Sequence, residues 1–508
     1  MQTRLWRFEA AVFLGLWLLF VGGAPSRFFR DPGTFWHTAI GRQILETGQL
    51  PRSDTFTLTV RGQPWISQSW LCEMAMAGLY QVGGWDSLLA VTAILLALVY
   101  AWLTGRLYRA GLAGICAVLA MVLAVAASSH QFHVRPVVVT IALTSCLFAL
   151  LVDVESGRRS LRQLWWLVPL CIVWTNIHGG VLGGLGTLVL VAGGWILGAW
   201  LGWESPLRCF RDGAELAGIV AVCGLSVLAN PYGLELPRLW FAILRLPLSE
   251  FIQEHGPLWL NAVPFLATNA LAVLFLGVML STSPRRLRAT HLMPLVWLVL
   301  AWERGRQSPL FAVIALLALA DLLPHSRFAR FLAWRGFFRD SAAESGAEVP
   351  RLGWRRFVLP LAVLLVSLVL QAGAVSVPLL GRGWARLDPT HWPIELLPEL
   401  EQLDARDGGR VRIFNEMLYG GFLIFHAPRV PVFVDDRCEL YGEAFLRRLA
   451  RLSLEDPTEF DRWDAELRFS YVLVASGTPI AAHLASSPNW EMVRQTQSAT
   501  LFRRKNRG

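Results

Sequence analysis

The sequence predicts a multispanning α-helical membrane protein with about eleven transmembrane helices and a C-terminal extracytoplasmic α/β domain. Of its 508 residues, 54% are hydrophobic and only 16% are charged, a balance that soluble globular proteins do not show. Apolar runs long enough to cross a bilayer recur along residues 1–380. From Trp384 onward the hydropathy drops, and short β-branched runs alternate with helical stretches.

The transmembrane prediction rests on apolar runs that approach the roughly 20 residues needed to span a bilayer. They lie near residues 8–24, 85–104, 111–129, 136–152, 163–177, 180–202, 214–229, 264–281, 290–302, 308–323 and 357–378. The first run follows Arg4 and Arg7 and resembles a signal peptide. Because Pro25 directly after Ala24 is a poor cleavage context, we expect this run to remain as a helix.

Arginine in alternate loops predicts the orientation. The arginine-rich loops contain Arg4 and Arg7, Arg106 and Arg109, Arg158, Arg159 and Arg162, Arg208 and Arg211, Arg285, Arg286 and Arg288, and the cluster 327–356. Because such loops stay in the cytoplasm, the N-terminus is predicted to be cytoplasmic. The predicted organisation is a transmembrane domain over 1–380, with a long first outer loop (25–84), and an extracytoplasmic domain over 381–508.

Four segments of the C-terminal domain read as strands, "RVRIF", "VPVFVDD", "YVLVAS" and "ATLFRR", and "EAFLRRLARL" and "PIAAHLASS" read as helices. Asp435, Asp436 and Arg437 follow the strand-like "VPVFV", at the end where open α/β sheets tend to bind ligands. We expect these residues to recognise an acceptor or to cover the membrane cavity. The structural alternative is an ion-paired loop that closes a strand.

Two function classes are not indicated. The net charge of +9 comes almost entirely from arginine, and no basic stripe interleaved with aromatic residues predicts a nucleic-acid partner. The seven cysteines show neither a C-x-x-C pair nor a Cys/His ligand spacing, so neither a zinc site nor a disulfide framework is predicted.

Polar residues gather on the predicted outer side, and together they predict a cavity at the outer membrane surface. They are Asp31, His37, Glu73, His130, His133, Arg135, Asn176, His178, Glu254, His255, Glu303, Arg304 and Arg306. Ionisable groups at membrane depth are costly and tend to line a cavity or a substrate path. Taken singly, each has a structural alternative: Asp31 before Pro32 could start a helix, and Arg135 could reach the lipid headgroups.

The first outer loop, which contains "DPGTFWHTAIGRQILETG", resembles that of the bacterial polytopic glycosyltransferases of the GT-C superfamily. This superfamily includes protein O-mannosyltransferases and lipid A aminoarabinose transferases. "HVRP", "NIHGG", "NPYG" and "NEMLYGGFLIFHAPRVPVFVDDR" are similar to an uncharacterised branch of such proteins. Before "WL", where a His or another polar hydrogen-bonding group is expected, this chain has Gln68 and Ser69. The paired acidic residues and the sequon-reading motif that characterise an oligosaccharyltransferase are missing from the sequence.

The resemblance implies an inverting glycosyltransferase that moves a hexose or pentose from a polyprenyl-phosphate carrier to a lipid, glycan or protein acceptor. It implies that Asp31 acts as base or metal ligand, with His37 beside it. Arg135, Arg304 and Arg306 are the candidates for the donor phosphate, and Glu73, His133, Asn176, His178 and Glu254 for polar groups of the cavity. No spacing specifies a metal site, so dependence on Mg²⁺ or Mn²⁺ is left open.

Other function classes remain as alternatives. A lipid-linked sugar flippase or transporter would also use charged groups, but the chain shows no clear internal repeat and its ionisable residues cluster at one face. An outer-face glycan polymerase or ligase would share the carrier and the topology. A non-catalytic scaffold would use the outer domain as a binding module.

Overall fold

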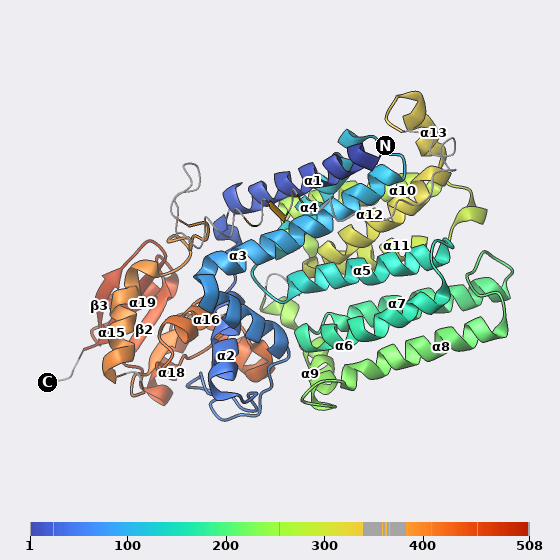
Figure 1. Cartoon of the computed structure of the whole chain (residues 1–508). Helices are drawn as coiled ribbons and strands as arrows, with labels where there is room; N and C mark the ends of the chain where they lie inside the picture. The colour runs from blue at the N-terminus through green and yellow to red at the C-terminus, as the bar shows by residue number, and fades with distance from the viewer. Residues whose placement is uncertain are drawn as a thin grey trace.

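The chain forms an elongated helical bundle with a smaller α/β unit at one end, as Figure 1 shows. The computed structural model describes residues 2–23, 25–252, 255–338, 358, 361–362, 365, 383–407, 409–454 and 456–505. Most of the predicted run at 357–378, and Glu254, lie outside these residues.

The helices of the bundle and of the first outer loop are α1 (Gln2–Leu18), α2 (Gly33–Thr47), α3 (Trp70–Arg109), α4 (Gly114–Ser128), α5 (Val137–Glu155), α6 (Leu167–Ile177), α7 (Val181–Trp200), α8 (Phe210–Leu225), α9 (Glu235–Arg245), α10 (Ala262–Leu280), α11 (Ala289–Glu303), α12 (Ser308–Leu322) and α13 (Arg327–Trp334). The C-terminal unit contains α15 (Leu397–Asp407), β1 (Ile413–Asn415), α16 (Met417–His426), α17 (Gly442–Leu454), α18 (Glu459–Leu467), β2 (Tyr471–Ala475), α19 (Pro479–Ser486), β3 (Trp490–Gln495) and β4 (Ala499–Arg504).

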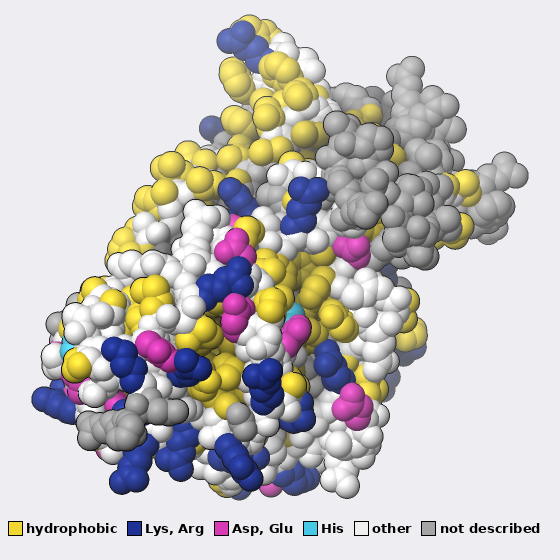
Figure 2. All heavy atoms as spheres, turned by 90° about the vertical axis from the view of Figure 1, so that its left-hand side faces the viewer, with side chains coloured by type: hydrophobic (Ala, Val, Ile, Leu, Met, Phe, Trp, Pro, Cys, Tyr) yellow, Lys and Arg dark blue, Asp and Glu magenta, His cyan; other side chains and the backbone are white. Residues whose placement is uncertain are grey.

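The two parts have different surfaces. Figure 2 shows charged side chains of both signs over the face of the C-terminal unit, and mainly hydrophobic side chains on the part of the molecule above it. Exposed apolar side chains on the bundle include Leu119, Leu190 and Val273. An apolar surface of this kind is stable when it faces lipid, so the protein is a membrane protein.

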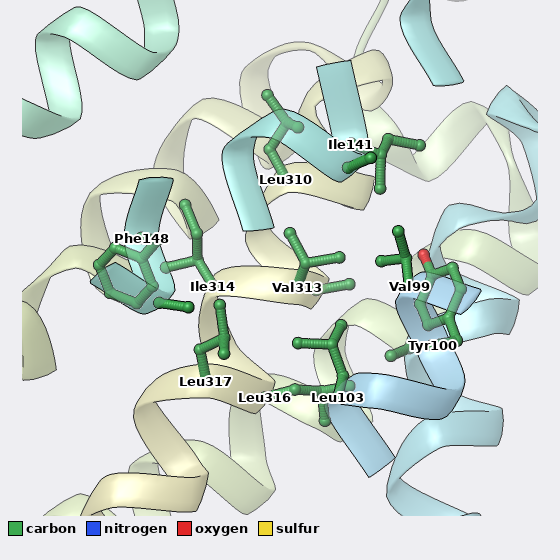
Figure 3. Packing of buried hydrophobic residues seen from close by; sticks show 14 of the residues in the cluster. Val99, Tyr100, Leu103, Ile141, Phe148, Leu310, Val313, Ile314, Leu316 and Leu317 are labelled. Atoms are coloured by element: carbon green, nitrogen blue, oxygen red, sulfur yellow. The ribbon is translucent and has the colours of Figure 1, made fainter. Parts of the chain in front are cut away.

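Helix α12 lies at the centre of the bundle. All of its residues except Ala320 are buried, and it packs against α3, α4, α5, α10 and α11. Figure 3 shows Leu310, Val313 and Leu317 of α12 between side chains of α3 and α5. A helix that is apolar all round is stable only where it is surrounded by other elements.

The predicted number of eleven transmembrane helices is not confirmed. Within the described residues, six helices are long and apolar enough to cross a membrane. Several of the predicted runs form shorter helices; for example, α6 extends over 11 residues and α11 over 15. At 1.5 Å per residue, such a helix is shorter than the hydrocarbon core.

The first outer loop continues directly into the bundle through α3. This 40-residue helix bends at Gly83 and Gly84, whose backbone angles are not helical. Gly84 adopts a φ of 60°, a region that glycine enters without steric cost. The bend separates the first part of α3, which belongs to the first outer loop, from the membrane run predicted at 85–104.

The C-terminal unit has one four-stranded sheet in the order β1-β2-β4-β3. Strands β1 and β2 are parallel, with Phe414 opposite Val472, and the other two pairs are antiparallel. The prediction of a strand at "VPVFVDD" is wrong, because this segment lies outside the sheet. It pairs instead with the first outer loop: the Leu58 N–H donates to the Val432 carbonyl at 2.7 Å, and the Val432 N–H donates to the Phe56 carbonyl at 3.0 Å.

The first outer loop and the C-terminal unit share one hydrophobic core. Phe35 of α2 packs edge-on against Trp392 and Phe422, and all three side chains are fully buried. Helix α16 approaches the loop closely at Gly421, where a Cβ atom would lie 2.2 Å from the Pro32 carbonyl oxygen. Only glycine allows this contact, which holds the segment next to Asp31 against the C-terminal unit.

Candidate active site

A cavity of about 830 Å³ lies where the bundle, the first outer loop and the C-terminal unit meet. The predicted site residues that line it are Asp31, His37, His133, Arg135, His178, Arg304, Arg306, Asp436 and Arg437. Glu73, Asn176 and Asp435 do not line it, and Glu254 lies outside the described residues. The structure thus brings together groups that are spread over some 400 positions of the sequence.

Asp31 and Arg135 form an ion pair in this cavity. The Arg135 Nη1 donates to Asp31 Oδ2 at 2.6 Å, and the Gly33 backbone N–H donates to Asp31 Oδ1 at 2.7 Å. The second contact shows that Asp31 also caps the start of α2, which is the structural alternative considered for this residue. A carboxylate has about four lone-pair positions, so two contacts leave room for a further proton or ligand.

His37 stands on the first turns of α2, where Glu73 of α3 orients it. Its Nδ1 lies 2.8 Å from Glu73 Oε1, and Glu73 also accepts from the Ser67 hydroxyl. Burial, and then the charge of Arg135, lower the pKa of His37 well below its ordinary value. The ring is therefore neutral at neutral pH and presents Nε2 as its second polar atom.

His178 also has a defined orientation. Its Nδ1 accepts from the Gly180 backbone N–H at 3.0 Å and lies 2.9 Å from the Thr140 hydroxyl, which itself accepts from Trp174 Nε1. Because Nδ1 accepts, the ring proton of a neutral His178 sits on Nε2. His178 can therefore donate a hydrogen bond through that atom.

Asn176 has a structural role in place of the predicted cavity role. Its side-chain amide donates to the carbonyls of Ile172 and Ala229, both at 2.8 Å, and its oxygen accepts from Trp70 Nε1 at 2.9 Å. These contacts tie α6 to the start of α3. His133 lies at the cavity, where its Nδ1 is 3.0 Å from the Arg27 carbonyl.

Arg304 and Arg306 follow α11 at the cavity. Arg306 contacts the His255 ring, and His130 Nε2 lies 3.0 Å from the Gly305 carbonyl between the two arginines. Among the described residues, no acidic side chain forms an ion pair with Arg304. Cationic side chains at this position can contact an anionic group such as a phosphate.

Arg437 forms a buried ion network between the C-terminal unit and the first outer loop. It donates to Asp435 Oδ2 at 2.6 Å and to Asp54 Oδ1 at 2.8 Å, and all three side chains are fully buried. Its guanidinium lies over the rings of Trp36, Phe56 and Trp65. The ion-paired loop that we considered for 435–437 is therefore present, but it faces the cavity.

Asp436 also lines the cavity, and unlike Asp435 it forms no ion pair with a cationic side chain among the described residues. Burial, and then the charge of Asp31, raise the pKa of Asp436 well above its ordinary value. The raised pKa favours the protonated form of this carboxyl group, which can donate as well as accept.

Several cavity residues were not among the predicted site residues. Trp36, Gln68, Ser69 and Glu439 line the cavity. Trp36 lies within the quoted motif that begins at Asp31, and Gln68 and Ser69 precede "WL" in the same loop, but Glu439 carries no sequence signal. Within the described part of the chain, no group of three or more His, Cys, Asp or Glu side chains is placed to hold a metal ion.

Comparison with known proteins identifies the fold. No protein-family model and no curated protein sequence matches the chain. The apo oligosaccharyltransferase from Archaeoglobus fulgidus superposes with a TM-score of 0.55 at 11% identity, covering 93% of this chain and 69% of that one. ArnT from Cupriavidus metallidurans, bound to undecaprenyl phosphate, superposes with a TM-score of 0.50 at 14% identity, covering 97% of both chains. The chain therefore shares the fold of these two proteins, and the predicted GT-C-like fold is confirmed.

Proposed function

We propose that this protein is an inverting glycosyltransferase that transfers a sugar from a polyprenyl-phosphate carrier to an acceptor hydroxyl or amide. The observation that carries the proposal is the Asp31–Arg135 pair, which lies in a cavity of about 830 Å³ bordered by Arg304 and Arg306. The cavity thus offers a carboxylate and cationic groups side by side. ArnT, which has the same fold, was solved with undecaprenyl phosphate bound.

In the proposed reaction, a carboxylate oxygen of Asp31 accepts the proton of the acceptor. The acceptor oxygen or nitrogen forms a bond to the anomeric carbon, and the bond between that carbon and the phosphate oxygen breaks. The electron pair leaves on the polyprenyl phosphate, whose negative charge Arg304 and Arg306 stabilise. A single displacement of this kind inverts the anomeric centre.

The proposed orientation places the cavity on the outer face of a bacterial cytoplasmic membrane, with the N-terminus in the cytoplasm. At the opposite end of the bundle, Arg158 and Arg288 both pair with Asp321, at 2.7 and 2.9 Å, and Arg106 pairs with Asp153. These arginines belong to the loops predicted to be cytoplasmic, and arginine-rich loops favour the cytoplasmic side.

The test is sugar transfer in reconstituted membranes, with a panel of radiolabelled undecaprenyl-phosphate sugars and a crude envelope extract as acceptor. We expect wild type to consume one donor and Asp31→Asn to lose about 10²-fold or more of the rate. Asp461→Asn is the matched control, because Asp461 pairs with His483 on the C-terminal unit away from the cavity. The proposal fails if wild type consumes no donor, and movement of lipid-linked sugars across the bilayer would then favour the flippase alternative.

A further inference from the structure

Several polar atoms of the cavity lining are buried and have no hydrogen-bond partner among the described residues. Four of these atoms belong to the first outer loop and to the segment after Val434. They are Trp36 Nε1, Ser69 Oγ, Asp436 Oδ1 and Arg437 Nη1. Trp36, Ser69 and Arg437 are 6%, 1% and 1% exposed. Buried polar groups are normally paired, so each of these atoms requires an explanation.

Unpaired atoms alone do not mark a site. Trp17 Nε1 and Trp195 Nε1, for example, are also buried without a partner, and neither residue lines the cavity. The four cavity atoms differ because they surround one space that a ligand can enter. They also come from two separate parts of the chain, the first outer loop and the segment after Val434.

The chemistry of these atoms specifies what they can bind. The N–H groups of Trp36 and Arg437 only donate, whereas the Ser69 hydroxyl and the Asp436 carboxyl group can donate and accept. A ligand that satisfies all four must present several oxygen atoms, some of which carry a proton. Neighbouring hydroxyl groups on a ring have this property.

The local charge disfavours a phosphate here. Arg437 already pairs with two carboxylates, those of Asp54 and Asp435, so its positive charge is already offset. Asp31, a further carboxylate, lies in the same lining. An anion would be repelled, whereas a neutral hydroxyl group can accept from Arg437 without a charge penalty. The cationic position for a phosphate lies elsewhere in the cavity, at Arg304 and Arg306.

We propose that Trp36, Ser69, Asp436 and Arg437 form a subsite for a sugar ring, placed next to Asp31 and apart from the phosphate position. The C-terminal unit thus supplies part of the sugar specificity through Asp436 and Arg437. The raised pKa of Asp436 agrees with a carboxyl group that donates to a hydroxyl oxygen. This inference rests on the proposed function, and it holds for the sugar of the donor or of a glycan acceptor.

The experiment measures binding to the full-length protein in nanodiscs. The variants are Trp36→Phe, which keeps a ring but removes the N–H, and Asp436→Ala. The first arm compares undecaprenyl phosphate alone with undecaprenyl phosphates that carry glucose, mannose or arabinose. The second arm adds methyl glycosides of the same sugars in the presence of undecaprenyl phosphate. Trp195→Phe is the matched control, because it removes an unpaired buried N–H outside the cavity.

We expect each cavity variant to weaken binding of the preferred sugar-bearing ligand by about three- to tenfold and to leave undecaprenyl phosphate alone within about twofold. An effect in the first arm assigns the subsite to the donor sugar, and an effect in the second arm to an acceptor sugar. The subsite is overturned if the sugar adds no affinity in wild type, or if the variants weaken bare and sugar-bearing carriers equally or not at all. Wild type that binds no undecaprenyl phosphate would instead overturn the proposed function, and the subsite with it. Melting temperatures show whether each variant is folded.

Discussion

Asp31 and Arg135 meet at 2.6 Å, although 104 residues separate them in the sequence. The contact joins the start of α2 to the segment before α5, and both segments line the cavity. It gives the carboxylate a fixed position, because Gly33 holds its other oxygen. The pair therefore links the stability of this end of the protein to the group proposed to accept the proton.

Removing one partner of this pair should cost more than removing both. In Arg135→Gln, the Asp31 carboxylate, whose side chain is 10% exposed, keeps its charge and loses its cation. We expect a loss of about 1–3 kcal/mol in the free energy of unfolding. The double variant Asp31→Asn/Arg135→Gln should recover part of that loss. Chemical denaturation in detergent measures all four proteins of the cycle, and strictly additive effects would contradict the expected coupling.

His37 should make stability depend on pH below neutrality. Burial, and then the charge of Arg135, lower the pKa of His37 in the folded protein. In the unfolded chain the same ring has a pKa of about 6.5. Just below pH 6.5, the unfolded chain therefore takes up a proton at this ring while the folded ring stays neutral. The unfolded state then binds more protons, and the stability that His37 contributes is lost as the pH falls below about 6.5.

The test compares melting temperatures of wild type and His37→Gln between pH 5 and pH 8. We expect the wild-type value to fall more steeply below about pH 6.5 than that of the variant. His483→Gln is the control, because that ring is partly exposed on the C-terminal unit. Parallel curves for wild type and His37→Gln would show that the ring does not behave as a buried neutral group.

The buried network of Arg437 should be essential for joining the first outer loop to the C-terminal unit. Asp54→Asn removes one of two carboxylates from a fully buried guanidinium, and the loss of one partner from a buried pair costs about 3–5 kcal/mol. Glu443→Gln, which alters an exposed pair with Arg447, should leave the melting temperature nearly unchanged. Equal, small shifts for both variants would contradict this role of Asp54.

The proposed orientation can be measured with reporter fusions. Alkaline phosphatase fused after Gly508 should be active, because the enzyme folds only outside the cytoplasm. The same reporter inserted after Ser160, which follows Arg158 at the arginine-rich end, should be inactive. Fluorescent-protein fusions at both positions supply the reverse readout. The opposite pattern would place the cavity in the cytoplasm and overturn the outer-face proposal.

The sequence determined the features that depend on local pattern. Apolar runs predicted helices in the bundle, and α4, α5, α7, α10 and α12 lie at such runs. The polar motifs around Asp31, Arg135, His178 and Arg304 do line one cavity, because they stand at helix ends on the same side of the bundle. Membrane burial makes this inference strong, since polar groups are costly elsewhere in an apolar bundle.

The tertiary structure alone decided how distant segments pair. "VPVFV" has strand composition, but its backbone partners are Phe56 and Leu58 and not another strand of the sheet. Arg437 finds Asp54 across 383 residues, and this contact brings Asp436 to the cavity. The local sequence does not determine such partners. Burial and hydrogen bonding of these segments are defined only when the first outer loop and the C-terminal unit pack into one shared core.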